Sequence, residues 1–516
     1  MGVPWLSLHM FVRKKQNKSG SVSVQIISKT SGKYKVFKTI GSSICPEQIE
    51  KYYVQAKYEI NKLRNQLSFI VEEKDVLIES FLDSISNSQI EVIGPELVFG
   101  RIFNYIGYGT IQEPLFRHLV ITRLVYPGSK LKTIEYLQRY QNLEISIDSI
   151  YRFLDTLQSK LKEQVENISF ARTKKILGGR IEIIFYDMTT LYFEASDEDD
   201  LRKTGFSKDG KHQCPQIYLG LLVAKDGYAI GYDIFEGNIS EGHTLIPMIR
   251  QFEKRFKLNK PVVIADSGLL SKDNIKSLED NEYEYIIGAR IKNETENIKG
   301  KILSLSLTNG KPVSIRKDNN SSLIVSYSSS RASKDLRNRT RGLQRLEKNI
   351  ASGKLTKSNI NNRGYNKYLK LDGEIKVTID REKFNTDSKW DGIKGYITNT
   401  KLNPEIVISN YKHLWQIEKA FRISKTDLRI RPIYHHLRKR IEAHICISFV
   451  AYGVYMDLER VLKLSDAGFS VKKASEMTQN MYQIKFVLPK SLREVTKTLK
   501  MDDNQRKLIK IINQYF

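Results

Sequence analysis

The segment IEIIFYD, residues 181–187, opens the part of the sequence that decides the fold, and it reads as a buried strand that ends in an acid. The pattern after it predicts two strands joined by a KDG hairpin turn, then a helix, a strand, a helix and a last strand. Three hairpin-linked strands followed by α/β crossovers predict a mixed sheet with helices packed on it. The runs that carry this pattern are QIYLGLLVA (216–224), YAIGYDIF (228–235), HTLIPMIRQFEKRF (243–256), PVVIAD (261–266), LLSKDNIKSLED (269–280) and YEYIIGAR (283–290).

On the N-terminal side, residues 1–45 contain short β-prone runs separated by turn residues, which predicts a small β-meander. Residues 46–178 form a predicted helical region, because apolar residues recur at intervals of three and four. Several short basic helices in a row suit a DNA-binding module. A helical packing domain explains the same pattern equally well.

On the C-terminal side, residues 291–395 are polar and interrupt the α/β pattern, so we predict a basic insertion that contains scattered strands. Residues 331–370 hold twelve Lys or Arg and only two acids. This charge favours a DNA-embracing element, although a flexible, solvated surface loop is the alternative. The first part of the core is then 179–290, its second part is 396–460, and 461–516 is predicted to be helical.

The composition indicates a partner with negative charge. The 516 residues include 84 Lys and Arg against 58 Asp and Glu, a formal net charge of +26. Nucleic acid is the first candidate. The longest uncharged run, 445–456, is too short to span a membrane and predicts a buried helix. Three widely spaced cysteines exclude a disulfide scaffold and a cysteine zinc site, and they fit a reducing cytoplasm.

Two acids follow strands of the predicted sheet. Asp187 closes the first strand, and Asp266 closes PVVIAD and precedes Ser267-Gly268, where the backbone can turn. Ligands of open α/β sheets bind beyond the strand ends. A cap or turn role explains either acid alone, but two such acids in one sheet favour a site.

A third acid, Glu418, lies in a predicted helix with Tyr411, Leu414 and Lys425. At about 100° per residue, these four positions fall in one stripe about 60° wide. Apolar residues flank the stripe, and burying a charge without a partner is costly, so the stripe favours a function. A solvated helix face with a chance spacing is the alternative.

Together these segments resemble the catalytic core of DDE-class insertion-sequence transposases. The helix signature of that family is Tyr-x2-Arg-x3-Glu-x6-Lys, which Tyr411, Glu418 and Lys425 match, while Leu414 replaces the usual Arg. The resemblance extends over about residues 100–460. Five further stretches carry it: YDMTTLYFEAS (186–196), DDLRKTGFSKDGK (199–211), QIYLGLLVAKDGYAIGYDIFEGN (216–238), ADSGLLSKDNI (265–275) and RPIYHHLRKRIEAHI (431–445).

The resemblance implies an RNase H-like fold and a transposase that cleaves and transfers the DNA ends of an insertion sequence. It implies that Asp187, Asp266 and Glu418 are the catalytic acids, which hold two Mg²⁺ ions, with Mn²⁺ as a possible substitute. Asp187 and Asp266 would share one ion, and Glu418 and Asp187 would hold the second. Two divalent ions about 4 Å apart suit in-line displacement at phosphorus, and Mg²⁺ prefers carboxylate oxygen.

The resemblance also implies DNA contacts and partners. Tyr411 and Lys425 would contact phosphate near the scissile bond, and Arg422 and Trp415 are further candidates, although Trp415 is expected to pack in the core. The partners would be double-stranded DNA, both terminal inverted repeats and target DNA, and a second copy in a homodimer. No membrane partner is expected, and the location would be the bacterial or archaeal cytoplasm, at the nucleoid.

Two other motifs are weighed and set aside. The histidines at 435, 436 and 444 lack the spacing of a zinc site and have no nearby cysteine. The segment SKDGK (207–211) lacks the pattern of a nucleotide-binding phosphate loop. Two alternatives to an active transposase stay open: a catalytically inactive DNA-binding protein derived from a transposase, and an RNase H-like nuclease.

Overall fold

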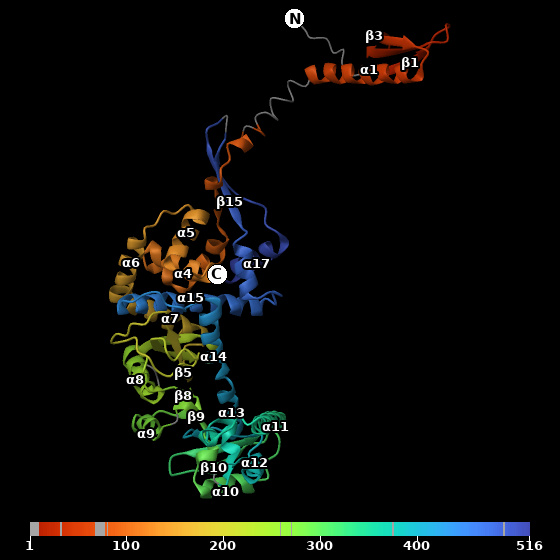
Figure 1. The fold of residues 1–516 in the computed structure, drawn as a ribbon. Helices are drawn as coiled ribbons and strands as arrows, with labels where there is room; N and C mark the ends of the chain where they lie inside the picture. Colours follow the sequence, from red (N-terminus) through yellow and green to blue (C-terminus); the bar gives the residue numbers. More distant parts are fainter. Residues whose placement is uncertain are drawn as a thin grey trace. The chain divides into compact units, whose positions relative to one another are not determined.

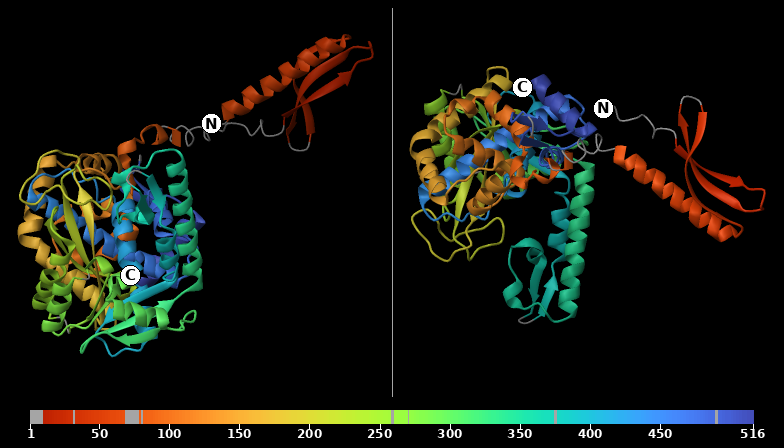
Figure 2. Two further views of the ribbon diagram at one scale, coloured as in Figure 1. Left: turned by 60° about the horizontal axis from the view of Figure 1, so that its bottom comes forward. Right: turned by 90° about the horizontal axis from the view of Figure 1, so that it is seen from above.

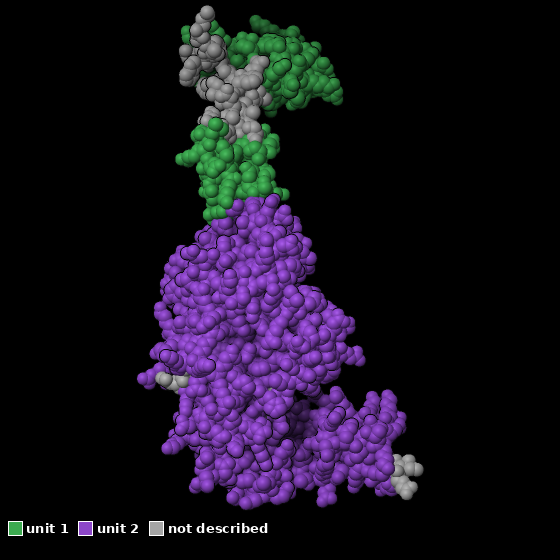
Figure 3. Space-filling model, turned by 90° about the vertical axis from the view of Figure 1, so that its left-hand side faces the viewer, with its two compact units in different colours: residues 1–90, 483–498 green, residues 91–482, 499–516 purple. Residues whose placement is uncertain are grey.

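The computed structural model describes residues 10–30, 33–67, 78–79, 81–257, 260–269, 271–373, 376–488 and 491–516. The chain divides into two compact units (Figure 3). The smaller unit comprises 1–90 and 483–498, and the larger comprises 91–482 and 499–516.

The smaller unit contains an antiparallel sheet and a helix. Strands β1 (Met10–Gln16), β2 (Val22–Thr30) and β3 (Lys33–Ser43) pair in sequence order, and α1 (Pro46–Leu67) follows. Val24 and Ile26 of the sheet pack with Ala56 and Ile60 of the helix. The predicted meander and first helix are therefore confirmed for the described residues; residues 1–9 lie outside them.

A β-hairpin in the C-terminal part of the chain refines one prediction. Strands β15 (Tyr482–Val487) and β16 (Glu494–Thr498) pair antiparallel. The C-terminal region 461–516 is predicted to be helical with interruptions, and this hairpin is an interruption that the sequence pattern does not identify. Helices α16 (Val471–Thr478) and α17 (Asp503–Tyr515) flank the hairpin in the sequence.

An eight-stranded mixed sheet organises the larger unit, with the order β10-β11-β14-β9-β8-β5-β6-β7. β5, β6 and β7 are antiparallel neighbours, whereas β5, β8 and β9 run parallel. Helices α8 and α9 provide the crossovers, which confirms the predicted element order and the RNase H-like mixed sheet. The bounds are β5 (Ile183–Tyr192), β6 (Gln216–Ala224), β7 (Ala229–Glu236), α8 (Leu245–Phe256), β8 (Val262–Ala265), α9 (Lys272–Asp280) and β9 (Tyr285–Ala289).

The long helix α15 (Arg438–Leu464) lies between the N-terminal helices of this unit and the sheet (Figure 1). Its residues 445–456 are buried except for Gly453 and Tyr455, as expected of a buried helix. Within the described residues, no helix has the length and apolarity that crossing a membrane requires. The surrounding helices are α3 (Arg101–Ile106), α4 (Pro114–Val125), α5 (Lys130–Gln141), α6 (Ile147–Thr156) and α7 (Lys162–Ile176).

The polar segment between β9 and the helix of Glu418 is only partly separate from the sheet. β10 (Val313–Arg316), β11 (Ser322–Tyr327) and β14 (Ile393–Thr398) extend the main sheet, and β14 pairs with β9. The stretch 291–395, predicted as one inserted domain, therefore supplies strands to the core itself. α10 (Glu296–Ser304) precedes these strands.

The remainder of the segment builds a small core of its own. The helix α11 (Ser329–Ala351) packs with a hairpin of β12 (Leu369–Asp372) and β13 (Lys376–Ile379), followed by α12 (Arg381–Ser388) (Figure 2, right). Leu346, Tyr368, Leu369 and Val377 are buried together. The helix α11 is not foreseen in the sequence, because apolar residues are sparse along it.

Candidate active site

Asp187 lies on β5, and Asp266 directly follows the adjacent parallel strand β8. The register pairs Tyr186 of β5 with Ala265 of β8. Each acid is the residue that directly follows one member of this pair. β5 does not end at Asp187, as predicted, but continues to Tyr192. Asp187 is instead the first residue beyond the segment of β5 that pairs with β8, which gives its side chain the access expected at a strand end.

Backbone amides orient both carboxylates. The amide of Met188 donates to Asp187 Oδ1 at 2.7 Å, and the amide of Gly268 donates to Asp266 Oδ1 at 2.7 Å. Asp266 is exposed, and the side chain of Asp187 is 24% exposed. Both groups can therefore reach a ligand while one oxygen of each is held in place.

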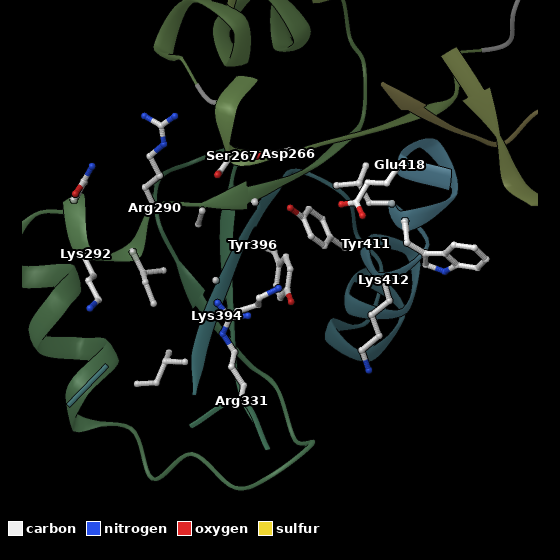
Figure 4. Close-up of a pocket in the computed structure, with 18 residues that line it drawn as sticks. Asp266, Ser267, Arg290, Lys292, Arg331, Lys394, Tyr396, Tyr411, Lys412 and Glu418 are labelled. Carbon is white, nitrogen blue, oxygen red and sulfur yellow. The ribbon is translucent and has the colours of Figure 1, made fainter. Parts of the chain in front are cut away.

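Glu418 faces the same region from helix α14 (Trp415–Arg422), which follows α13 (Pro404–Lys412). Ile417, Ala420 and Phe421 are buried and fix α14 on the core, which leaves Glu418 exposed. Glu418 and Asp266 line one cavity of about 700 Å³ (Figure 4). The structure thus brings together two acids that are far apart in the sequence.

Tyr411 lies between Asp266 and Glu418 in this cavity (Figure 4). Burial raises the pKa of the Tyr411 hydroxyl, and the nearby Asp266, Glu418 and Asp187 carboxylates raise it further. All three predicted acids therefore act electrostatically on one hydroxyl group. A Cβ atom at Gly288 of β9 would lie 2.5 Å from that hydroxyl oxygen, so the close approach of Tyr411 requires glycine there.

The donor set suits a hard divalent cation, although the acids do not form a closed ligand shell. Within the described part of the chain, no group of three or more His, Cys, Asp or Glu is positioned to hold a metal ion. Carboxylate oxygens are the ligands that Mg²⁺ prefers. The Lys208 ammonium group already lies 3.4 Å from Asp187 Oδ1 and donates to the carbonyl of Met188 at 2.7 Å. This contact shows that a cation can be held beside Asp187.

Cationic side chains supply the opposite wall of the cavity. Arg331, Lys394 and Lys412 line it together with the acids (Figure 4). Burial lowers the pKa of Lys394, and the charge of Arg331 lowers it further. Such a wall favours a polyanion. Sequence reasoning missed Arg331 and Lys394 as site residues, because both lie in the polar segment, far in the sequence from the acids.

The predicted helical stripe is wrong as a continuous stripe. The helix is interrupted between Lys412 and Trp415, and a π-helical turn occupies Ile423–Asp427. The regular 100° spacing assumed for the stripe therefore does not hold over its whole length. Lys425 instead donates to Asp209 Oδ2 at 3.1 Å, and burial lowers its pKa.

The other residues predicted to contact DNA are placed as follows. Arg422 is exposed on α14, and its charge acts on the hydroxyl of Tyr455. Trp415 is 49% exposed and lines the cavity, so the prediction that it packs in the core is wrong. The reason is that Trp415 begins α14 on the face that carries Glu418.

The segment 207–211, which does not match a phosphate loop, contacts Asp187 and also the residues that follow α14. Lys208 contacts Asp187, while Asp209 accepts from Lys425 and pairs with Arg431 at 2.5 Å. The sequence motif SKDGK was visible, but its contacts across the fold were not. No residue spacing predicts them.

The three histidines contact protein groups. His435 and His444 are buried, with ring centroids 5.6 Å apart, and His436 lies 3.1 Å from the Arg202 guanidinium. His444 Nε2 bonds to the carbonyl of Ile430 at 2.9 Å. None of these histidines belongs to a metal-binding group of the described residues.

Comparison with known proteins gives one family match and several distant structural likenesses. Residues 178–454 match the Transposase DDE domain family. A piggyBac transposase synaptic complex with hairpin DNA is 11% identical, with a TM-score of 0.38, covering 75% of this chain and 78% of that chain. A Mos1 transposase paired-end complex with the left transposon end is 13% identical, with a TM-score of 0.16, covering 31% and 53%. A search of curated proteins found no match. Because the matched segment is more than half of the sequence and includes Asp187, Asp266 and Glu418, the chain belongs to the Transposase DDE domain family.

Proposed function

We propose that the protein catalyses metal-dependent cleavage and strand transfer of insertion-sequence DNA ends. The observation that carries this proposal is the cavity in which Asp266 and Glu418 face Tyr411, with Asp187 on the adjoining strand. An acidic wall and a cationic wall in one cavity fit a reaction at a phosphodiester, which needs both charge signs. Two Mg²⁺ ions, or Mn²⁺, would stabilise charge on the attacking and leaving oxygens.

The carboxylates are proposed to bind metal, and the hydroxyl and cationic groups are proposed to bind phosphate. Asp187 and Asp266 would hold one ion, and Asp187 and Glu418 would hold the other. Tyr411, Lys425 and Arg422 are the proposed phosphate contacts near the scissile bond. None of these three groups is proposed to read base sequence, because contacts to phosphate position DNA without specifying its sequence.

The reaction would proceed in two steps. Water first attacks phosphorus at the element end, which breaks the P–O3′ bond and leaves a 3′-hydroxyl and a 5′-phosphate. The freed 3′-hydroxyl then attacks a phosphorus atom of target DNA, joining the strands and displacing a second 3′-oxygen. Because two ends must be joined, the active assembly is proposed to be a homodimer bound to terminal inverted repeats and target DNA.

Helix α11 supports a DNA-embracing role for the polar segment. Arg331 at its start lines the cavity, and a row of exposed cations continues along the helix. At about 100° per residue, the row falls in a stripe about 80° wide. Its members are Lys334, Arg337, Arg341, Arg345 and Lys348. A duplex that leaves the cavity along α11 would meet this stripe.

Replacing Arg341 and Arg345 together by glutamine is expected to make the negative slope of log affinity against log salt shallower by about two. Each phosphate contact that is lost means that about one counterion fewer is released when DNA binds. The measurement is DNA binding over a salt series. Replacing Lys272 and Lys276, both exposed on α9, by glutamine is the matched control. Equal slopes for the two double variants would refute the role of α11.

The function itself is tested with a duplex bearing the terminal repeats of the element, which the genomic sequence flanking the gene would supply. The parent protein is expected to nick this duplex at the repeat end with Mg²⁺ and to lose all cleavage when EDTA removes the metal. A preference for an RNA–DNA hybrid would favour the RNase H-like nuclease instead. Tight binding to the repeats without cleavage would favour the inactive DNA-binding protein.

A further inference from the structure

A second cavity, of about 750 Å³, opens at the start of α5 and along the segment that follows α14. Five cationic residues line it: Arg123, Lys130, Lys132, Arg429 and Arg431. Of the described residues that line the cavity, none is acidic. The walls therefore carry positive charge that the cavity itself does not neutralise.

Lys130 is the most unusual of these residues. It is the first residue of α5 and is only 6% exposed. Among the described residues, no carboxylate or other acceptor forms a hydrogen bond or ion pair with its ammonium group. Burial and the nearby Arg123 together hold the pKa of Lys130 well below its usual range. Burial without a partner disfavours the charged form of this lysine, and an anion that arrives from outside the chain would restore its charge.

Arg123, which lines the same cavity as Lys130, is also buried without an acidic partner. Its side chain is 4% exposed, and its guanidinium donates to the carbonyl oxygens of Leu428 and Arg429 over 3.5 and 3.4 Å. These are long bonds to neutral acceptors, and burial lowers the pKa of Arg123 to about 10. The cavity thus holds two buried cations without a neutralising carboxylate, which together match a ligand with two negative charges.

One further feature of the wall is suited to an anion. Ser129 caps the N-terminus of α5, a helix of twelve residues, and the first turn of such a helix favours negative charge. This observation is independent of the lysine and arginine.

The cavity also offers aromatic rings and a connection to the active site. Tyr126 and Tyr434 line it and are 42% and 63% exposed, and Tyr151 lies on the same wall. Exposed aromatic rings beside cations are typical of surfaces that bind single DNA strands. Arg431 lines the cavity and pairs with Asp209, which also accepts from Lys425.

We propose that this cavity binds the 5′-terminal phosphate of a DNA strand, with the first bases against the exposed tyrosines. A phosphate monoester carries nearly two negative charges at neutral pH, which matches Lys130 and Arg123. The assignment of the ligand as DNA rests on the proposed function, whose hydrolytic step leaves such a 5′-phosphate. The assignment of a phosphate pocket rests on the cavity alone.

The test compares two labelled oligonucleotides of one sequence, one with a 5′-phosphate and one with a 5′-hydroxyl. Binding to the full chain is measured in EDTA, so that no cleavage occurs. The parent is expected to bind the phosphorylated strand at least about tenfold more tightly. In Lys130→Met the ratio is expected to fall to about one, while the thermal midpoint stays equal or rises because an unpaired charge is removed. Lys276→Met, on α9, is the control and should keep the ratio of the parent.

Each other outcome has a defined meaning. A ratio of one in the parent, or a parental ratio in a folded Lys130→Met, overturns the proposal. If Lys130→Met does not fold, the binding ratio of Arg123→Met is compared with that of the parent. A parental ratio in a folded Arg123→Met then overturns the proposal. If inorganic phosphate raises the thermal midpoint of the parent at constant ionic strength but the ratio is one, the pocket takes free phosphate, and the DNA-end assignment is overturned. Because the binding assay contains no metal, a failed cleavage assay does not change the meaning of the binding ratio. A failed binding assay likewise does not change the meaning of the cleavage result.

Discussion

Alanine in place of Asp187, Asp266 or Glu418 is expected to reduce terminal-repeat cleavage by at least about a thousandfold, since in the proposed mechanism each change removes one of the three carboxylates that would hold two divalent ions. The carboxylates lie on β5, directly after β8, and on α14, and each is oriented by a different element. Loss of one therefore cannot be offset by the others. The measurement is the single-turnover rate of cleavage with saturating Mg²⁺.

The control is Asp280→Asn, which removes an exposed acid from the end of α9 and should leave the rate unchanged. DNA affinity measured in EDTA should be equal or slightly higher in the three alanine variants, because negative charge near the DNA is removed. Parental cleavage by any of the three would show that this acid is not part of the site. Loss of both affinity and cleavage would indicate misfolding rather than lost chemistry.

Asp457→Ala is expected to lower the free energy of unfolding by about 3–5 kcal/mol, the range for removing one partner of a buried ion pair. Asp457 of α15 is fully buried and accepts from Arg172 of α7 through both carboxylate oxygens, at 2.6 and 3.0 Å. Arg460 donates to the same group at 3.1 Å. The change would leave two guanidinium groups facing a buried, uncharged site. Urea unfolding followed by circular dichroism measures the difference.

Asp155→Ala provides the comparison, because Asp155 is 26% exposed and pairs with Arg440 and Lys439 near the surface. Its expected effect is below about 1 kcal/mol. The double variant Asp457→Ala/Arg172→Met should recover part of the loss, because it removes one of the unpaired charges. If Asp457→Ala unfolds at the same urea concentration as Asp155→Ala, the ion pair does not hold α7 to α15 as described.

The central sheet could be predicted because its strands are continuous apolar runs that end at turns. The patterns of IEIIFYD and PVVIAD are sufficient to predict two strands of one sheet, each followed by an acid. That the two strands are neighbours is seen only in the pairing of β5 with β8. The actual end of β5 could not be predicted, because TTLY continues the strand along β6 after the pairing with β8 stops. Access to Asp187 depends on where the partner strand ends, and this is a property of the fold.

The polar segment resisted prediction for a different reason. Leu343, Leu346 and Ile350 have helical spacing in α11, but the cations around them outnumber the apolar residues. β14 is short, and its role is visible only through pairing with β9 and β11. The contacts of Lys208 and Asp209 with the active site cross from one loop to distant elements. Local pattern carries no information about such contacts.

The pairing of β9 with β14 has a consequence for how the chain folds during synthesis. β9 ends at Ala289, and its partner begins only at Ile393, so more than a hundred residues must leave the ribosome before this edge is covered. Contacts of such long sequence separation form slowly. Glu418 follows later still, so a nascent chain holds both aspartates well before the third acid of the proposed site is made. A partly made polypeptide would therefore carry cations and two of the three acids without the complete acidic set of the proposed site.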